Sequence, residues 1–275
     1  MIYNKIFSYF NDKLLFYENY YNYKKIKNTF IDSQKYLYKN NPLISVYIPT
    51  YNRRKLLESR SLPSVLNQSY QNIEVNIIGD RCNDDTQDYI ESINDNRVKF
   101  INISYKKKPF PETKENLWLA GEVIAANYAL KICKGDWIAR LDDDDIFTNT
   151  HIEDLLKYAN LSNLEFVSGM SQSEIEGEEI LHVSPFLHSN YFKNKHQKIN
   201  NTNSQLGAHS TWMYKNYLKM FKYNTNCWRK SWNRVNDVDL AQRFFKAGVK
   251  MGYLKKSTLI QNPRPGSTNI GFKAL

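Results

Sequence analysis

Long apolar runs are absent from this sequence of 275 residues. No stretch approaches the roughly 18 to 20 apolar residues that are needed to cross a bilayer. Near the N-terminus, Lys5, Asp12 and Lys13 interrupt any apolar segment of the kind found in secretory signals. We therefore expect a protein without a membrane span or a secretory leader.

Cysteine is scarce as well. Cys82, Cys133 and Cys227 stand far apart, lack the spacing of a metal site and are odd in number. Exported proteins tend to pair their cysteines, whereas cytoplasmic proteins keep them reduced. The sequence therefore predicts reduced thiols and a cytoplasmic location, with peripheral contact on the inner face of the membrane as an alternative within that compartment.

The balance of charge is positive, with a formal net charge of +10 at pH 7. Basic proteins bind nucleic acid, anionic lipid surfaces or phosphorylated small molecules, so charge alone does not choose among these partners. The one dense basic run, Lys106-Lys107-Lys108, is interpreted as a solvated loop. A nucleic-acid-binding protein is kept as an alternative, although it would be expected to show a basic helix or strands studded with aromatic residues.

Residues 1–40 contain no Gly or Pro and are crowded with Tyr, Phe, Lys and Asn. Apolar side chains recur there at roughly helical spacing, which predicts one or two amphipathic helices. This apolar stripe comprises Ile2, Ile6, Phe7, Phe10, Leu14 and Tyr17. We predict a helical extension over residues 1–41 whose stripe packs on the main domain. The alternative is that its aromatic and lysine side chains lie on an anionic membrane.

An α/β rhythm begins after Pro42. Strands are predicted at residues 43–48, 73–78, 97–103 and 135–141, and two more short strands within 165–183. Helices are predicted at residues 53–66 (with Pro63 marking a kink or a break), 84–93, 121–133 and 236–247, and a capping box at 150–153 begins another. A polar loop is expected at 186–203, and a tail rich in Pro, Gly and Ser at 261–269.

Strands that alternate with helices of about 10 to 15 residues imply βαβ units and a mainly parallel sheet. We therefore predict an α/β domain over residues 42–275, in which the alternation is regular up to the aspartates at 142–145 and loosens after them. In such sheets, ligands bind beyond the carboxyl ends of the strands.

Three polar segments follow directly after predicted strands: residues 49–52, Gly79-Asp80 and the four aspartates at 142–145. Because the carboxyl ends of parallel strands meet at one edge of a sheet, we expect these segments to converge. The aspartates are the strongest signal. Side chains alternate along an extended chain, so Asp142 and Asp144 would share a face. Adjacent carboxylates suit a hard cation such as Mg²⁺ or Mn²⁺, which also binds substrate phosphates.

Several stretches resemble a family 2 glycosyltransferase of the GT-A fold, an inverting enzyme that uses nucleotide sugars. They are residues 46–53 (VYIPTYNR), 64–70 (SVLNQSY), 77–80 (IIGD), 135–145 (GDWIARLDDDD) and 236–243 (NDVDLAQR). The resemblance covers about residues 42–250. It implies a nucleotide-binding half at 42–150, with the acceptor-binding half and the C-terminal tail at 151–275. It implies sugar transfer from a nucleotide diphosphate sugar to a glycan, a lipid-linked acceptor or another hydroxyl acceptor, within the synthesis of bacterial capsule or lipopolysaccharide.

The resemblance also implies a role for particular residues. The catalytic base would be Asp237, with Asp239 as the rival assignment, and the metal ligand would be Asp144, holding Mg²⁺ or Mn²⁺. The nucleotide would be bound by Pro49, Thr50, Tyr51, Arg53, Asp80, Asp142 and Asp143. Contacts to phosphate or acceptor are assigned to His209, Arg264 and Ser267.

Three structural interpretations compete with these roles. An acid in the first turn of a helix is favoured by the helix dipole, so Asp237 could be purely structural. Asp145 could cap the following helix, and Tyr51 could be a core aromatic residue. A sugar nucleotidyltransferase is the alternative enzyme class. It would be expected to carry a Gly-rich phosphate loop after the first strand, and residues 49–53 contain no Gly.

Overall fold

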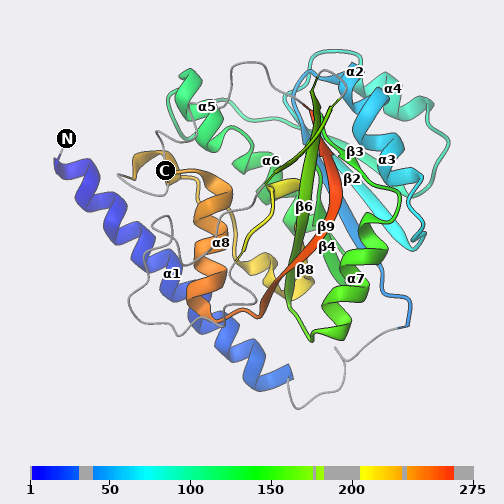
Figure 1. The fold of residues 1–275 in the computed structure, drawn as a ribbon. Coiled ribbons are helices and arrows are strands. Elements are labelled where there is room, and N and C mark those ends of the chain that lie inside the picture. Colours follow the sequence, from blue (N-terminus) through cyan, green and yellow to red (C-terminus); the bar gives the residue numbers. More distant parts are fainter. Residues whose placement is uncertain (1, 31–39, 176–177, 183–204, 231–233, 263–275) are drawn as a thin grey trace.

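A mixed β-sheet forms the centre of the molecule in the computed structural model, which describes residues 2–30, 40–175, 178–182, 205–230 and 234–262. The strand order is β3-β2-β1-β4-β8-β6-β9-β5, and β7 pairs with β6 (Figure 1). The strands are β1 (Ile44–Thr50), β2 (Ile73–Asp80), β3 (Val98–Ile103), β4 (Trp137–Arg140), β5 (Ile146–Phe147), β6 (Phe166–Ile175), β7 (Glu178–His182), β8 (Met213–Lys215) and β9 (Met251–Gln261).

The first four strands form a parallel block, because β1 pairs in parallel with both β2 and β4, and β2 pairs in parallel with β3. Every residue of β1 is buried, as expected for a β-branched strand covered on both faces. Beyond β4 the sheet becomes mixed: β8 runs antiparallel to β4 and β6, whereas β6 and β9 are parallel. The predicted α/β fold with a mainly parallel sheet is confirmed.

Helices cover both faces of this sheet (Figure 1). The elements are α1 (Ile2–Phe30), α2 (Arg54–Leu56), the π-turn η2 (Leu57–Ser61), α3 (Leu62–Leu66), α4 (Thr86–Ser92), α5 (Lys114–Ala120), α6 (Val123–Ile132), α7 (His151–Leu161), α8 (Asn236–Ala247) and the 3₁₀ turns η5 (His209–Thr211), η6 (Asn216–Met220) and η7 (Cys227–Arg229). One core cluster joins the sheet to α5, α6, α8 and α1, and the other joins it to η2, α3, α4 and α7.

The helical segment after β1 runs through Pro63 with a π-turn in place of a break. Pro63 has no amide hydrogen to donate, and its ring crowds the preceding turn. The chain widens locally, so that the amide of Leu62 donates to the carbonyl of Leu57, five residues earlier. This geometry is typical of a π-bulge. The predicted helix is therefore present, and Pro63 widens it instead of ending it.

Helix α7 begins at the predicted place, but the predicted capping box is wrong. The Thr150 side chain makes no capping hydrogen bond; its hydroxyl donates to Asp154 at 2.6 Å. The Glu153 carboxylate accepts from the Ser69 hydroxyl at 2.7 Å, because the chain that follows α3 lies beside this helix. Tertiary partners therefore replace the local capping interaction.

Helix α5 and the strands β8 and β9 were not predicted. In β9 the paired lysines Lys255 and Lys256 are exposed, which breaks the alternation by which a strand is recognised in sequence. The pairing of β9 with β6 shifts register between Gly169 and Ser171, and this irregularity accommodates the exposed segment. Strand β9 is therefore a product of long-range pairing.

The N-terminal helix α1 packs on α8, which agrees with the predicted helical extension. Its buried contacts combine the ring of Tyr23, which packs edge-to-face on Phe221, with two hydrogen bonds. Arg243 of α8 donates to the Asn19 side-chain oxygen at 2.6 Å, and the Tyr23 hydroxyl donates to Glu165 at 2.8 Å. Both Asn19 and Tyr23 are buried. In the N-terminal half of α1, Asp12 accepts from Asn224 at 2.9 Å and pairs with Lys230 at 3.1 Å, so both halves of the helix are joined to the core.

The predicted packing role of the apolar stripe is wrong for its described members. Phe10, Leu14 and Tyr17 are 60%, 67% and 50% exposed, and Tyr21 continues the same row at 67%. Residues 10, 14, 17 and 21 follow helical spacing, so they share one face of α1. The side chains of Ile2, Ile6 and Phe7 lie outside those that the structure describes. Among the described helices, none is both long enough and apolar enough to cross a membrane.

Candidate active site

A pocket of about 530 Å³ lies at the carboxyl ends of β1, β2 and β4. Its wall also includes the start of α6, the turn η5 and the first residues of α8. The convergence of the three polar segments is confirmed. Most of the predicted site residues line this pocket: Pro49, Thr50, Tyr51, Arg53, Asp80, Asp142, Asp143, His209 and Asp237. Tyr51 is 56% exposed, so it is not a core aromatic residue.

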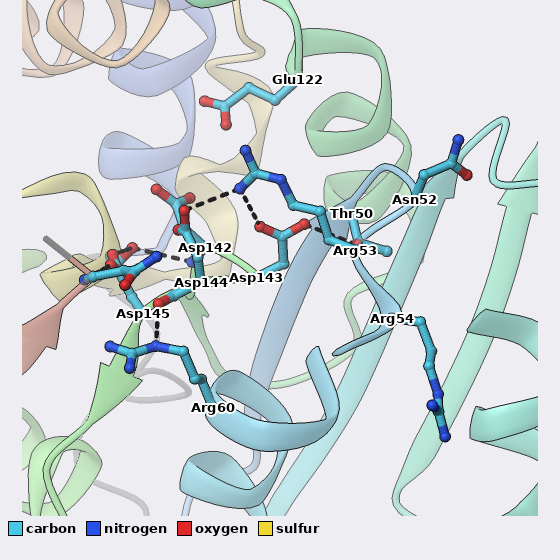
Figure 2. A network of polar contacts seen from close by, with 12 residues as sticks. Thr50, Asn52, Arg53, Arg54, Arg60, Glu122, Asp142, Asp143, Asp144 and Asp145 are labelled. Atoms are coloured by element: carbon cyan, nitrogen blue, oxygen red, sulfur yellow. Dashed lines mark hydrogen bonds and ion pairs between the residues drawn. The ribbon is translucent and has the colours of Figure 1, made fainter. Parts of the chain in front are cut away.

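Three of the four consecutive aspartates form a cluster beside the pocket. Carboxylate oxygens of Asp142, Asp144 and Asp145 all lie within 4.8 Å of one another. The Ser210 hydroxyl donates to Asp145 at 2.8 Å and accepts from the backbone amide of Asp142 at 3.0 Å. The backbone amide of Asn262 donates to the other oxygen of Asp145 at 3.1 Å. These contacts fix the loop that carries the cluster (Figure 2).

The cluster has the donor set that suits a hard divalent cation. Its ligands are carboxylate oxygens, which Mg²⁺ and Mn²⁺ prefer. Burial, together with the charges of Asp142 and Asp144, raises the pKa of Asp145 to about 7. Such crowding of buried negative charge is relieved when a cation binds. Asp145 therefore joins Asp142 and Asp144 as a candidate ligand, and it does not cap α7, which begins only at His151.

Asp143 lies apart from this cluster and faces β1. The Thr50 hydroxyl donates to Asp143 at 2.8 Å, and Arg53 donates to it at 3.0 Å. The same guanidinium nitrogen donates to Asp144 at 3.0 Å, so Arg53 links the two carboxylates (Figure 2). Burial raises the pKa of Asp143 to about 6, although Arg53 acts in the opposite direction.

Asp80 ends β2 and is held by a buried lysine. Lys108 donates to Asp80 at 2.5 Å and to the carbonyl of Gly121 at 3.2 Å, and the Tyr105 hydroxyl also donates to Asp80. Lys108 is 6% exposed. The prediction of a solvated lysine run is therefore wrong for Lys108, because its ammonium group pairs with a buried carboxylate at the sheet edge.

The two acids at the start of α8 differ in their surroundings. Asp237 lines the pocket, and burial raises its pKa. Asp239 is 2% exposed and accepts from Lys230 at 2.6 Å and from Arg243 at 2.9 Å. These two cations hold the pKa of Asp239 below its usual value despite its burial. Asp239 thus has structural partners, whereas Asp237 faces the space where a ligand would bind.

Sequence reasoning missed a polar network in the pocket wall, centred on the buried side chain of Arg140. Arg140 is fully buried and donates to Asp142 at 2.6 Å and to Glu122. His209 lies 3.6 Å from Glu122 and shares a 2.7 Å hydrogen bond with the Tyr223 hydroxyl. The contact between Arg140 and Asp142 could have been predicted, because side chains two residues apart in an extended chain share one face. Glu122 carried no such signal.

Two predicted contact residues, Arg264 and Ser267, lie outside the described residues, as does most of the predicted tail at 261–269. The predicted loop at 186–203 also falls outside them.

Comparison with known proteins identifies a family and several relatives. The family Glycosyl transferase family 2 matches residues 45–220, more than half of the chain. The putative colanic acid biosynthesis glycosyl transferase WcaA of Escherichia coli K12 is 34% identical over 123 residues, which make up 44% of this chain and 39% of that protein. The UDP-Glc:alpha-D-GlcNAc-diphosphoundecaprenol beta-1,3-glucosyltransferase WfaP of Escherichia coli is 35% identical over 124 residues, 45% of this chain and 44% of that protein. The match spans less than half the length of either relative.

Solved structures show the same fold at low sequence identity. Residues 1–349 of Staphylococcus aureus TarS superpose with a TM-score of 0.56 at 20% identity, covering 80% of this chain and 60% of that one. The mannosyltransferase PcManGT of Pyrobaculum calidifontis, in complex with GDP-Man and Mn²⁺, gives a TM-score of 0.56 at 14% identity, covering 96% and 70%. These likenesses are to the fold and confirm the GT-A architecture.

The family match begins in β1 and extends beyond β8 into η6. It therefore includes the strands that form the pocket and the aspartates beside it. This favours the predicted glycosyltransferase over the alternative of a sugar nucleotidyltransferase. The chain belongs to Glycosyl transferase family 2.

Proposed function

We propose that this enzyme transfers a sugar, with inversion and with the help of a divalent cation, to a lipid-linked glycan during bacterial surface polysaccharide synthesis. The observation that carries this proposal is a single pocket whose wall contains both Asp142, from the acidic cluster, and Asp237. A leaving diphosphate and an acceptor hydroxyl need these two kinds of group close together.

The donor would be bound along the ends of β1, β2 and β4. Pro49, Thr50 and Tyr51 would line the space for the nucleobase, and Asp80 would hydrogen-bond the base or the ribose. Asp142 would approach the ribose from the other side. Arg53 supplies a guanidinium group beside the acidic cluster, a group that suits phosphate oxygens.

Asp142, Asp144 and Asp145 would hold the cation. When bound, Mg²⁺ or Mn²⁺ would supply positive charge to the leaving nucleoside diphosphate. Asp237 would take the proton of the acceptor hydroxyl as that oxygen attacks the anomeric carbon. The bond from that carbon to the diphosphate oxygen breaks with its electron pair going to the diphosphate. A single displacement of this kind inverts the anomeric centre.

The acceptor class is supported by the names of relatives. WfaP acts on a GlcNAc-diphosphoundecaprenol, and a Campylobacter jejuni relative, 30% identical over 122 residues, is named as a glucosyltransferase for a diNAcBac-PP-undecaprenol glycan. Such an acceptor is held at a membrane surface by its lipid. His209, at the pocket wall, would contact the acceptor or the phosphates.

Helix α1 supports a peripheral position on the membrane. Its exposed row of Phe10, Leu14, Tyr17 and Tyr21 lies on a helix that also exposes lysines, at positions 13, 24 and 25. Aromatic rings that enter the headgroup region, together with lysines that meet anionic lipid, are typical of helices lying in a membrane interface. The three cysteines are free, which is the state that a reducing cytoplasm maintains. We place the enzyme on the cytoplasmic face of the membrane.

The test begins with donor binding. UDP, UDP-glucose, UDP-GlcNAc, GDP and GDP-mannose would be titrated by calorimetry with Mn²⁺ and with a chelator. We expect at least one nucleotide to bind with Mn²⁺ and to lose at least about tenfold in affinity with the chelator. Asp144→Asn should bind as the wild type does in chelator, whereas Asp88→Asn, on the exposed face of α4, should bind normally.

Transfer would then be measured with a matching donor and an undecaprenyl-diphosphate sugar acceptor. The product linkage, determined by NMR, should have the anomeric configuration opposite to that of the donor. Equal nucleotide affinity with Mn²⁺ and with chelator would remove the cation from the mechanism, and retention of configuration would remove the single displacement.

A further inference from the structure

Glu122 is a carboxylate in the pocket wall to which the proposed reaction assigns no role. It is the N-cap residue of α6 and makes no capping hydrogen bond with its side chain. The residues that follow it are largely apolar and buried, including Val123, Ala125 and Ala126. Its side chain is 29% exposed and lines the pocket. Figure 2 shows its carboxylate above the acidic loop, on the same side as the guanidinium of Arg53.

The buried guanidinium of Arg140 fixes the position of the Glu122 carboxylate. The Arg140 guanidinium donates to Glu122 and to Asp142, and it lies between the rings of Tyr47 and Tyr223, at 5.8 Å and 6.0 Å from their centroids. Arg140 is fully buried, and its Nη1 has no hydrogen-bond partner in the described structure. Because a guanidinium stays protonated in proteins, Arg140 attracts the carboxylates of Glu122 and Asp142 and holds them in place.

A chain of hydrogen bonds ends at His209, close to the second oxygen of Glu122. The Tyr47 and Tyr223 hydroxyls are 2.7 Å apart, Tyr223 is 2.7 Å from Nε2 of His209, and Nδ1 of His209 lies 3.6 Å from Glu122. Burial, together with the charge of Arg140, holds the pKa of His209 well below its usual value. His209 is therefore neutral at physiological pH and adds no positive charge to this end of the pocket.

This end of the pocket is electronegative. Glu122 and Asp237 both line it, together with Asp142. Burial raises the pKa of Glu122 to about 7, and the charges of Asp142 and Asp237 contribute to that rise while Arg140 acts against it. A carboxylate has about four lone-pair positions, and among the hydrogen bonds of the described residues only Arg140 donates to Glu122. Because this side chain lines the pocket, it retains acceptor capacity for a ligand there.

We propose that Glu122 selects the donor sugar by accepting hydrogen bonds from the hydroxyls of an uncharged sugar and repelling a sugar that carries its own carboxylate. This inference rests on the proposed function, which puts the transferred sugar between the diphosphate and Asp237. The substrate class it assigns is neutral hexoses and their N-acetylated forms, and the class it excludes is uronic acids. Like charges brought together in a partly desolvated site strongly disfavour binding.

The test compares sugars that differ only at one carbon. UDP-glucose and UDP-glucuronate differ by a hydroxymethyl group against a carboxylate; GDP-mannose and GDP-mannuronate are the equivalent pair if guanine nucleotides bind. Dissociation constants would be measured by calorimetry with Mn²⁺ at pH 8, above the raised pKa of Glu122. We expect the wild type to bind the uronate at least about tenfold more weakly than the neutral sugar.

Glu122→Gln keeps the shape of the side chain and an oxygen for Arg140 while removing the charge. In this variant the ratio of the two dissociation constants should fall to about threefold or less. Affinity for UDP or GDP alone should stay within about twofold of the wild type, because the proposed function puts the diphosphate at Arg53 and the acidic cluster and the transferred sugar at Glu122. The matched control, Glu91→Gln on the exposed face of α4, should keep the wild-type ratio.

Several results would overturn the assignment. One is equal affinity of the wild type for the two sugars, which requires no variant. Another is an unchanged ratio in Glu122→Gln, and a third is a loss of UDP or GDP binding in that variant, which would make Glu122 a structural counterion of Arg140. Failure of the proposed function is distinct, because the wild type would then bind neither UDP nor GDP in a way that depends on Mn²⁺.

Discussion

The four neighbouring aspartates at 142–145 have different surroundings although their side chains are identical. Asp142 meets Arg140, Asp143 meets Thr50 and Arg53, and Asp145 meets Ser210. Each contact comes from a different element, so the order of the aspartates along the chain does not decide which carboxylate does what. Burial raises the pKa of Asp143 and Asp145 in particular, which marks this loop as a place where negative charge is concentrated.

The first prediction at this scale concerns Asp237 as the base. An acceptor hydroxyl is a poor nucleophile until its proton is taken, and a positioned base contributes about 10² to 10⁴ in rate. Asp237→Asn retains the shape of the side chain and leaves the acidic cluster intact. We expect nucleotide affinity close to that of the wild type and turnover reduced by at least roughly 100-fold. Calorimetry and an assay of sugar transfer measure the two quantities.

Asp239→Asn is the matched comparison. Asp239 pairs with Lys230 and Arg243 in a buried site, so its replacement leaves buried cations without their counterion. We expect a loss of about 3 kcal/mol in the free energy of unfolding, with turnover per folded molecule close to normal. Full turnover in Asp237→Asn would exclude Asp237 as the base. A loss of about 100-fold confined to Asp239→Asn would assign that role to Asp239 instead.

At the scale of elements, α1 shows how a helix can present two functional faces. Its buried face carries polar groups that reach Arg243 and Glu165, and its exposed face carries the aromatic row. This arrangement is the reverse of the usual amphipathic helix, in which the apolar stripe faces the core. The helix therefore remains attached to α8 while its apolar side chains are available to another surface.

Membrane binding by α1 is predicted to depend on this row. Replacing Phe10, Leu14 and Tyr17 together by Ser removes apolar area from the exposed face without touching Asn19 or Tyr23. In sedimentation with vesicles of phosphatidylethanolamine and phosphatidylglycerol, the wild type should bind and the triple variant should bind at least about tenfold more weakly. Raising the salt concentration should weaken the wild type as well, because lysines contribute to the attraction.

The control for this experiment is Leu161→Ser, which removes an apolar side chain that is 80% exposed at the end of α7. It should leave vesicle binding unchanged. If the triple variant binds vesicles as well as the wild type does, or if the wild type binds only neutral vesicles, α1 is not an anionic-membrane helix. Sedimentation equilibrium would show whether the row instead joins two copies of the chain.

At the scale of the whole molecule, the site depends on segments that are far apart in sequence. Strand β9 pairs with β6 and β5, and the backbone of Asn262, just after β9, donates to Asp145. The first residue of α7, His151, shares a 2.8 Å hydrogen bond with the carbonyl of Thr258 in β9 and stacks on Phe147 with ring centroids 3.6 Å apart. These contacts connect the acidic loop and the start of α7 to β9.

The contact at His151 predicts a pH dependence of stability. Burial lowers the pKa of His151 from 6.5 to about 3. The unfolded chain therefore takes up a proton below pH 6.5 while the folded protein does not, so stability falls as the pH falls through this window. Between pH 6.5 and 5 the loss from this group alone is about 2 kcal/mol. Urea unfolding at pH 7, 6 and 5 measures it.

The variant that isolates this effect is His151→Asn, which retains a donor for the carbonyl of Thr258 but does not titrate. It should be less stable than the wild type at pH 7, because the stacked ring is lost. The difference in unfolding free energy between the two proteins should shrink by about 2 kcal/mol from pH 7 to pH 5. A constant difference over this range would mean that His151 is protonated in the folded protein or does not contribute.

The sequence by itself determined the parallel block and the edge at which the polar segments meet. Buried parallel strands are continuous apolar runs, and their carboxyl ends necessarily share an edge, so Thr50, Asp80 and the aspartates could be placed together without coordinates. Asp144 could be proposed for the same reason, whereas the role of Asp237 came from the resemblance to family 2 glycosyltransferases. The division of the chain at residues 41 and 150 and the roles of the site residues remain predictions.

Only the tertiary structure decided which groups face one another across that edge. Lys108 lies in a loop that the sequence marks as solvated, yet it is buried against Asp80. Glu122 gains its place from Arg140 and His209, which arrive from β4 and η5. Local periodicity reports whether a side chain is buried or exposed along one element. It carries no information about the partner that another element brings to it, and that partner sets the charge and the direction of each group in the site.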